Sequence, residues 1–399
     1  MATFWSAAAA AAAFVTLLAG CHARESAAPP PIILISIDTL RSDHLPVYGY
    51  RGIVTPHFDA FRRDAVLFER AYSHSPLTLP SHATILTGAL PSAHGVRDNV
   101  GFRMKDVPRL PAQLKTRGYA TAAAVSAYVL RGGTGIAEGF DAYDDEIDRG
   151  AREQSLGAVQ RAGAKTIEIA QHWIGSQSEE KPFFYFLHLY EPHAPYEAPE
   201  PFRSRYEKPY DAEVAYSDAL LGDFLAFLKQ RGIYDRAMIV VLSDHGEGLG
   251  DHDEDEHGIF LYREAIQVPL LVKLPAQARA GETVKTPVGL QDVAPMILGG
   301  TVDVAPHAIY SETWYPRFHF GWSDLHSLVD GDEHFIDAPR AELYDLRADP
   351  AERNNVIADR RRRAAALRAA LAPLKREAEA PSAVDAEEAQ KLAALGDRA

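Results

Sequence analysis

The stretch PIILISI at residues 31–37, followed by Asp38 and Thr39, decides the fold class. It is almost entirely apolar and rich in isoleucine, which is typical of a strand buried on both faces of a parallel sheet. Similar runs predict further strands over residues 119–125, 183–189, 237–243 and 268–274, and helical patterns cover residues 155–174 and 211–230. Two more helices are expected from Pro56, with Thr55 as its cap, and near Pro80. Strands that alternate with helices predict an α/β fold, with a mixed, mostly parallel central sheet and helices on both faces.

The last quarter of the chain changes character. After about Gly299 the predicted strands shorten and lose the helices between them, and from Ile357 onward the chain is rich in Ala, Arg and Glu. We therefore expect a catalytic domain over residues 32–299. A small C-terminal α+β subdomain over residues 300–356 and a helical tail over residues 357–399 should follow it.

Composition narrows the class of protein. The chain has 399 residues, of which 47% are hydrophobic and 24% charged, as in an ordinary globular protein. Its 41 Lys and Arg residues against 55 Asp and Glu residues give a formal net charge of −14. A nucleic-acid binder would carry a basic surface, so no nucleic-acid partner is expected.

The N-terminus is typical of an export signal. An apolar run over residues 7–19 ends in Leu17-Leu18-Ala19-Gly20-Cys21, which resembles a bacterial lipoprotein signal. Residues 1–20 would be removed, Cys21 would carry the lipid that binds the membrane, and residues 21–31 would form a tether. No Lys or Arg precedes Ala7, which keeps a plain secretory signal or an uncleaved anchor open. Each alternative predicts an exported protein of the periplasm or cell envelope, and the only cysteine leaves no intramolecular disulfide.

Metal-ligand residues follow two of the predicted strands. Asp38 comes directly after the first strand, and Asp244 and His245 come after the strand at residues 237–243. Ligands of open parallel sheets bind beyond the carboxyl ends of the strands. Two carboxylates and an imidazole at that edge predict a site for a divalent metal. Helix caps or turns are the alternative use of such aspartates.

A hydroxyl group is predicted near the same edge. In the segment SPLTLPSH at residues 75–82, Pro80 suits the first turn of a helix, so Thr78 should lie just before the helix N-terminus. Free N–H groups there favour an anion, and a hydroxyl beside a metal can act as a nucleophile. A simple helix-capping role for Thr78 is the alternative.

Several motifs in a fixed order resemble the sulfatase-like branch of the alkaline phosphatase superfamily. The resemblance covers roughly residues 32–356. It is carried by IDTLRSD (37–43), TLPSH (78–82), TG (87–88), HGV (94–96), HLYEPH (188–193), SDHGE (243–247), EHG (256–258), VPL (268–270), ELYDL (342–346), DP (349–350) and Glu352.

The resemblance implies a metal-dependent hydrolase of ester bonds. It implies one divalent metal (Mg, Ca, Mn or Zn), with Asp38, Thr78, Asp244 and His245 as ligands. Thr78 falls where sulfatases carry their nucleophile. His193 and His257 fall where groups contact the oxygens of the transferred group or protonate the leaving oxygen. His82 and His188 are expected to bind substrate. A second metal is possible, with His252 as a weak candidate ligand beside His188 or His193.

Departures from the family pattern decide the expected substrate. Thr78 cannot form the formylglycine that sulfatases make from Cys or Ser. The second Asp of the opening pair is Thr39, the motif Arg is His82, and the expected Lys before the Val-Pro segment is His257. The family's Lys-x-His falls near Ala127 and Val129.

The cations that hold sulfate are therefore largely absent, which favours phosphoric or phosphonic esters of small molecules, glycans or lipids. The alternatives are a sulfuric ester hydrolase, a transferase of the phosphoethanolamine type, and a non-catalytic lipoprotein that binds an anion.

Three further segments have open roles. The acidic run at residues 251–257 reads as a solvated loop, and the basic run at residues 360–363 as a solvated helical face. The aromatic residues Trp314 and Tyr315 either line a pocket or simply pack, since Trp and Tyr do both.

Overall fold

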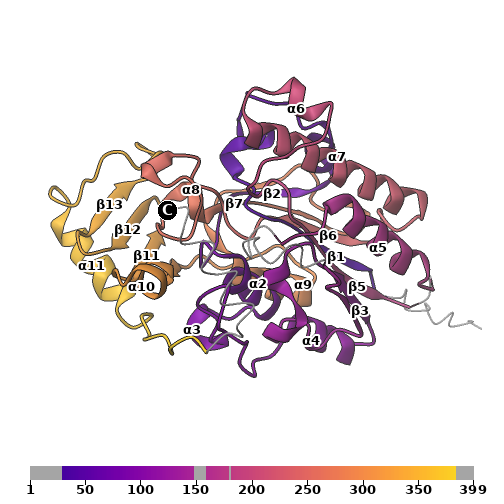
Figure 1. The fold of residues 1–399 in the computed structure, drawn as a ribbon, viewed down its shortest axis with the longest axis horizontal. Coiled ribbons are helices and arrows are strands. Elements are labelled where there is room, and N and C mark those ends of the chain that lie inside the picture. Colours follow the sequence, from indigo (N-terminus) through magenta and orange to yellow (C-terminus); the bar gives the residue numbers. More distant parts are fainter. Residues whose placement is uncertain (1–28, 148–158, 179–180, 383–399) are drawn as a thin grey trace, which may run out of the picture.

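A computed structural model describes residues 29–147, 159–178 and 181–382 of the chain (Figure 1). The predicted signal over residues 1–20, Cys21, most of the tether and the end of the helical tail lie outside these residues. Among the helices of the described part, none has the length and apolar character needed to cross a bilayer.

The larger sheet has the strand order β4-β3-β5-β1-β6-β7-β2-β8, and β9 also pairs with β2. The first five strands in this order, β4, β3, β5, β1 and β6, are parallel to one another. β7 is antiparallel to both of its neighbours, β6 and β2. This arrangement confirms the predicted mixed, mostly parallel sheet. The strands are β1 (Ile32–Ile37), β2 (Val66–Tyr72), β3 (Ala120–Ala124), β4 (Ala142–Asp144), β5 (Phe183–Leu189), β6 (Met238–Leu242), β7 (Gln267–Lys273), β8 (Thr283–Val284) and β9 (Val288–Gly289).

Helices cover both faces of this sheet (Figure 1). On one face pack α2 (Thr78–Thr87), α4 (Leu110–Thr116) and α9 (Val293–Gly299). On the other pack α1 (Pro56–Asp64), α5 (Gly163–Gly175) and α7 (Pro209–Gln230). Successive residues of β1 alternate between the two cores, with Leu34 in one and Ile35 in the other. Shorter helices are α3 (Pro91–His94), α6 (Phe202–Arg205) and α8 (Arg263–Ile266).

A second, smaller sheet lies beside the first. Its four strands are antiparallel in chain order: β10 (Ile309–Thr313), β11 (Leu325–Asp330), β12 (Glu333–Asp337) and β13 (Glu342–Asp345). The helix α11 (Arg361–Leu371) packs Leu367 and Leu371 against one face, and α10 (Tyr315–Phe320) lies in the connection between β10 and β11. Between α9 and β10, residues 301–308 form neither helix nor strand and lead into the smaller sheet.

The strand β2 was not predicted from the sequence. Its apolar residues are interrupted by Glu69 and Arg70, which break the pattern of a buried strand. In the structure the register with β7 shifts between Phe68 and Ala71, so the two charged residues occupy an irregularity where their side chains reach outward. Because this bulge interrupts the apolar pattern, the strand cannot be predicted from the spacing of its hydrophobic residues.

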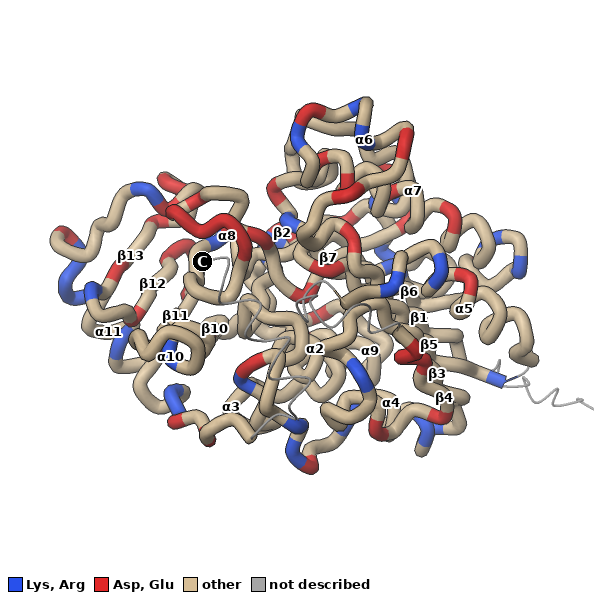
Figure 2. Tube along the Cα trace, in the orientation of Figure 1, with Lys and Arg blue, Asp and Glu red and all other residues tan. Residues whose placement is uncertain are grey.

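Charged residues of both signs are interspersed over the outer loops and helices (Figure 2). The basic run at residues 360–363 pairs with the smaller sheet: Arg360 contacts Asp345 at 2.7 Å and Arg363 contacts Asp330 at 2.8 Å. These partners place Arg360 and Arg363 in a local ion-pair network with the smaller sheet.

The start of α1 depends on a carboxylate from another helix. Asp218, in the middle of α7, accepts hydrogen bonds from the backbone N–H groups of Phe58 at 2.7 Å and His57 at 3.1 Å. Thr55, the residue before the helix, makes no capping bond through its side chain. Asp218 therefore caps α1 across the interface between the two helices.

Asp218→Ala should lower the free energy of unfolding by about 1–2 kcal/mol, because the N–H groups of His57 and Phe58 at the helix start lose their acceptor. Asp218→Asn should cost less, since one oxygen remains. Asp223→Ala, at an exposed position of the same helix, is the matched control and should be nearly neutral. Urea denaturation of the three variants measures this, and equal losses for Asp218→Ala and Asp223→Ala would exclude the capping role.

Candidate metal centre and active site

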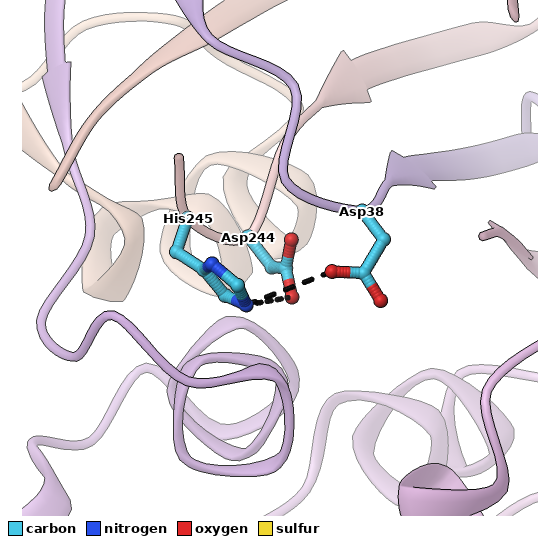
Figure 3. A group of neighbouring side chains, drawn as sticks. All are labelled: Asp38, Asp244 and His245. Carbon is cyan, nitrogen blue, oxygen red and sulfur yellow. Dashed lines mark ion pairs between the residues drawn. The ribbon is translucent and has the colours of Figure 1, made fainter. Parts of the chain in front are cut away.

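Three predicted ligands meet at one edge of the larger sheet. Asp38 follows β1, and Asp244 and His245 follow β6, which pairs with β1 in parallel. All three side chains are buried, and one ligand atom from each lies within 4.8 Å of the others (Figure 3). His245 Nε2 is 3.4 Å from Asp244 Oδ2 and 3.6 Å from Asp38 Oδ1. The three side chains therefore lie together at this edge, and their role as metal ligands stays a prediction.

The two carboxylates have the character of cation ligands. Within the described part of the chain, neither oxygen of Asp38 nor Oδ2 of Asp244 has a hydrogen-bond partner. Burial and the charge of Asp38 raise the pKa of Asp244 well above its ordinary value. Burial also opposes ionisation of Asp38, but His188, His193 and His245 together lower its pKa. Buried carboxylates without donors are costly unless a cation compensates them, so these residues fit a divalent metal.

The imidazole of His245 is held in the form that binds metals. Its Nδ1–H donates to the backbone oxygen of Gly246 at 2.9 Å, which leaves the lone pair of Nε2 facing the carboxylates. An outer hydrogen bond of this kind fixes the tautomer of metal-binding histidines. Two carboxylates and one imidazole suit Mg, Ca, Mn or Zn and do not single out one of them.

Thr78 brings a hydroxyl group to the same place. It is the first residue of α2, one position further into the helix than predicted, and its Oγ1 lies 3.2 Å from His245 Nε2. The hydroxyl of Ser81, one turn later, donates to the backbone oxygen of Asp244 at 2.7 Å. This bond ties the first turn of α2 to the loop that carries two of the candidate ligands.

Short-range contacts lock the loops that follow β1 and β6 together. Ser243 Oγ accepts from the N–H of Leu40 at 2.9 Å and donates to the oxygen of His245 at 2.7 Å. Arg41 Nη1 donates to the backbone oxygen of Glu247 at 3.0 Å. A Cβ at Gly246 would lie 1.8 Å from the backbone oxygen of Glu264, so only glycine fits after His245.

Thr39 is held in an uncommon conformation. Its φ of 52° is in the left-handed region, which costs a β-branched residue about 1–2 kcal/mol. In that conformation its N–H donates to Asp244 Oδ1 at 3.3 Å. The backbone of Thr39 thus holds one of the two carboxylates, in the position where the family carries a second aspartate.

His82 lies beneath the centre rather than at its surface. Its Nδ1–H donates to the oxygen of Thr78 at 2.7 Å, and Nε2 accepts from Ser36 Oγ at 2.9 Å. Burial, with a contribution from His188, lowers the pKa of His82 to about 3, so the ring is neutral. In this structure His82 supports the first turn of α2, and a contact with substrate stays a prediction.

His188, at the end of β5, stands behind Asp38. Its Nε2 is 3.3 Å from Asp38 Oδ2, and its Nδ1 accepts from the N–H of Ser126 at 3.4 Å. The ring is fully buried. His188 therefore lies against a candidate metal ligand, and its role in binding substrate or a second metal stays a prediction.

His193 and His257 stand together near His245. Their ring centroids are 5.1 Å apart, and that of His257 is 4.4 Å from that of His245. His193 Nδ1–H donates to the oxygen of Ala194 at 2.6 Å. Both rings thus lie near His245, and their contacts with substrate stay a prediction.

Glu247 is a residue of the site to which the sequence reasoning gave no role. Its Oε1 is 2.8 Å from His257 Nδ1, and its Oε2 accepts from the hydroxyl of Tyr196 at 3.0 Å. Burial opposes protonation of His257, but the charge of Glu247 outweighs it and raises the pKa of His257 to about 9. The motif SDHGE contains Glu247, yet its pairing with His257 depends on the folding of the intervening loop.

His252 is engaged elsewhere. Its Nδ1 pairs with Glu264, its Nε2 donates to the oxygen of Glu352 at 3.1 Å, and its ring stacks on Tyr262 with centroids 3.8 Å apart. These contacts join the acidic loop to the C-terminal segment. The position gives no support for His252 as a ligand of a second metal.

The sequence model described as Sulfatase matches residues 30–304, which is more than half of the chain. The protein therefore belongs to the Sulfatase family and is a sulfatase-like hydrolase of the alkaline phosphatase superfamily, acting on ester bonds. Enzymes of this family are metal-dependent, in agreement with the buried Asp-Asp-His group.

Individual relatives are distant. The chain is 24% identical to an ulvan-active sulfatase of Formosa agariphila over 72% of this chain and 65% of that protein, slightly less than two thirds of its length. It is 23% identical to an arylsulfatase of Clostridium perfringens, over 82% of this chain and 90% of the other. A solved phosphonate monoester hydrolase of Agrobacterium radiobacter has the same fold, with a TM-score of 0.71 and 21% identity over 86% of this chain and 95% of the other.

Asp244→Asn should stabilise the metal-free protein by about 1–2 kcal/mol, because it removes one of two buried like charges. The same change should abolish the stabilisation that a divalent cation gives the wild type. That stabilisation is about 2.7 kcal/mol when the cation is present at a hundred times its dissociation constant. Thermal unfolding with EDTA and with each of Mg, Mn, Ca and Zn measures both effects. A wild type that melts at the same temperature with and without every cation would contradict the metal centre.

Proposed function

We propose that this protein hydrolyses phosphoric or phosphonic esters with Thr78 as the nucleophile. The observation that carries the proposal is the position of Thr78 Oγ1, buried at the start of α2 and 3.2 Å from Nε2 of His245. A hydroxyl in that position shares the site of the candidate metal ligands. The hydrogen bond from Ser81 Oγ to the backbone oxygen of Asp244 holds the helix turn that carries this hydroxyl.

The residues support a two-step reaction. A divalent cation held by Asp38, Asp244 and His245 would supply positive charge that favours ionisation of a hydroxyl and offsets the charge of the ester. Thr78 Oγ1 loses its proton to solvent and forms a bond to phosphorus, while the bond from phosphorus to the leaving oxygen breaks and that oxygen takes a proton from His257. Water then attacks the phosphothreonine, which breaks the bond from Oγ1 to phosphorus, releases the phosphate or phosphonate and returns the proton to Thr78.

In this proposal, His193 and His257 serve the oxygens in these steps. Because Nδ1 of His257 is bound to Glu247, Nε2 is the nitrogen left for the substrate. We assign proton donation to the leaving oxygen to His257 and contact with a non-bridging oxygen to His193.

Three features favour phosphorus over sulfur. Thr78 has no route to formylglycine, so release of the transferred group needs attack by water on the Thr78 ester itself. His82, which replaces the motif Arg, is buried and neutral. Ala127 and Val129 are buried apolar residues where the family pattern has a Lys and a His.

Hydrolysis of sulfuric esters is the second candidate. The family match and the two relatives above, both named as sulfatases, favour it. A side-by-side assay of 4-nitrophenyl sulfate, 4-nitrophenyl phosphate, bis(4-nitrophenyl) phosphate and 4-nitrophenyl phenylphosphonate separates the two candidates. The same assay with added alcohol acceptors shows whether the group is transferred to a hydroxyl.

Thr78→Ala should lower kcat/KM for the preferred ester by at least about 10³-fold, because the group that accepts phosphorus is lost. Thr78→Ser, which keeps the hydroxyl, should retain activity within about tenfold. Thr87→Ala, at the other end of α2, is the control and should change little. Full activity of Thr78→Ala, or faster turnover of the sulfate ester than of every phosphorus ester, would overturn the proposal.

His257→Ala should slow esters of poorly acidic alcohols more than 4-nitrophenyl esters. A good leaving group needs no proton, so the losses should differ by about 10²-fold or more. Exposed His172→Ala is the control. Equal losses for alkyl and nitrophenyl esters would assign His257 to binding rather than to proton donation.

A further inference from the structure

We propose that an apolar pocket beside α10 binds the uncharged hydrophobic group of the substrate's leaving alcohol, an aryl ring or the first part of an alkyl chain. This inference rests on the proposed function, since it places the leaving group of the same ester. The pocket lies between the segment that follows His257 and the smaller sheet. Nothing in the catalytic roles described above uses it.

The pocket is a small hydrophobic cavity of about 190 Å³. Its walls come from three places: the 259–262 segment, the α10 region and the strands β11 and β12. The side chains that make it apolar are Ile259, Phe260, Pro316, Trp322, Leu325 and Ile336. An apolar cavity of about 150 Å³ is enough to hold benzene, so this one accommodates a single ring or a short chain.

Exposed aromatic residues stand at this pocket. Among the described residues, the large hydrophobic side chains that are markedly exposed are Trp322 at 60%, Val54 at 55% and Phe320 at 36%. Trp322 lines the pocket, and its ring centroid is 4.9 Å from that of Phe320. Two large apolar side chains left in water side by side indicate a contact surface for a ligand.

The wall of the pocket begins two residues after the proposed proton donor His257, with Gly258 between them. This residue follows His257 and precedes Ile259, the first residue of the pocket wall. A Cβ at Gly258 would lie 3.2 Å from Leu77 Cδ2 and 3.4 Å from Tyr315 Cγ. Leu77 immediately precedes the nucleophile Thr78, and Tyr315 begins α10. Gly258 therefore directly follows the proposed proton donor His257. It packs between Leu77, which precedes the proposed nucleophile, and Tyr315 of α10.

Side-chain contacts fix α10 in this place. His319 stacks on Tyr315 with ring centroids 4.0 Å apart, and its Nε2 is 2.9 Å from Asp98 Oδ2. The neighbouring Asn99 accepts the N–H of Leu79, in the first turn of α2, at 2.8 Å. α10 and the helix that carries Thr78 are thus tied to one loop, which fixes the pocket residues of α10 relative to the proposed nucleophile.

The chemistry of the walls selects an apolar group over a sugar. The carboxylate of Glu342, at the pocket, already accepts hydrogen bonds from Tyr262 at 2.9 Å and Tyr344 at 2.7 Å. A sugar would bury hydroxyl groups against apolar walls with few hydrogen-bond partners, and each unpaired hydroxyl costs binding energy. An aryl or alkyl group gains from the same walls through burial and through contact with Trp322.

The test compares methyl, butyl, phenyl and 2-naphthyl monoesters of whichever acid the wild type hydrolyses. The wild type should prefer the phenyl and naphthyl esters to the methyl ester by about tenfold or more in kcat/KM. Trp322→Ala opens the pocket and Ala338→Phe fills it. Each variant should lose that preference and keep the wild-type kcat/KM for the methyl ester. Val54→Ala, at the exposed hydrophobic residue outside the pocket lining, should keep the preference.

A second readout separates this inference from the proposed function. Neutral 2-naphthol, which carries no ester, should bind the wild type and Thr78→Ala equally and bind Ala338→Phe at least tenfold more weakly, as measured by fluorescence titration. Such binding in a protein that hydrolyses none of the esters would contradict the proposed function and support the pocket. Turnover with no effect of Trp322→Ala or Ala338→Phe on leaving-group preference would overturn the pocket.

Discussion

Two buried carboxylates held side by side are the constraint on which the rest of this structure depends. Asp38 and Asp244 repel one another, and three of their four oxygens have no hydrogen-bond donor in the described part of the chain. Parallel pairing of β1 with β6 brings them together. Strain at Thr39 and the close approach at Gly246 keep them there. Holding these carboxylates together lowers the stability of the metal-free fold. A bound cation would restore that stability.

Much of the fold follows from local patterns. The apolar runs around Ile35, Phe186 and Val240 predict buried strands, because only the centre of a sheet hides every side chain. The direction of β7 does not follow, since a strand buried on both faces has the same pattern whether it runs parallel or antiparallel. β2 escapes prediction for a different reason: Glu69 and Arg70 sit at a register shift inside it.

The residues of the candidate site also differ in how far the sequence predicts them. Asp38, Asp244 and His245 are predictable because they end strands whose carboxyl ends share an edge. Glu247 and Tyr196 are not, since they meet through a hydrogen bond between residues 51 positions apart in the chain. His82 shows the limit of a motif: its position matches the family pattern, yet both ring nitrogens face protein groups and the side chain is fully buried.

The placement of α10 has a consequence for how such enzymes diverge. The helix occupies the connection between β10 and β11, two adjacent antiparallel strands, whereas the candidate metal ligands belong to the larger sheet. Connections of this kind tolerate insertions and deletions, because their ends stay paired while their length changes. Descendants of this gene can therefore lengthen, shorten or replace α10 while the ancestral reaction centre passes on intact.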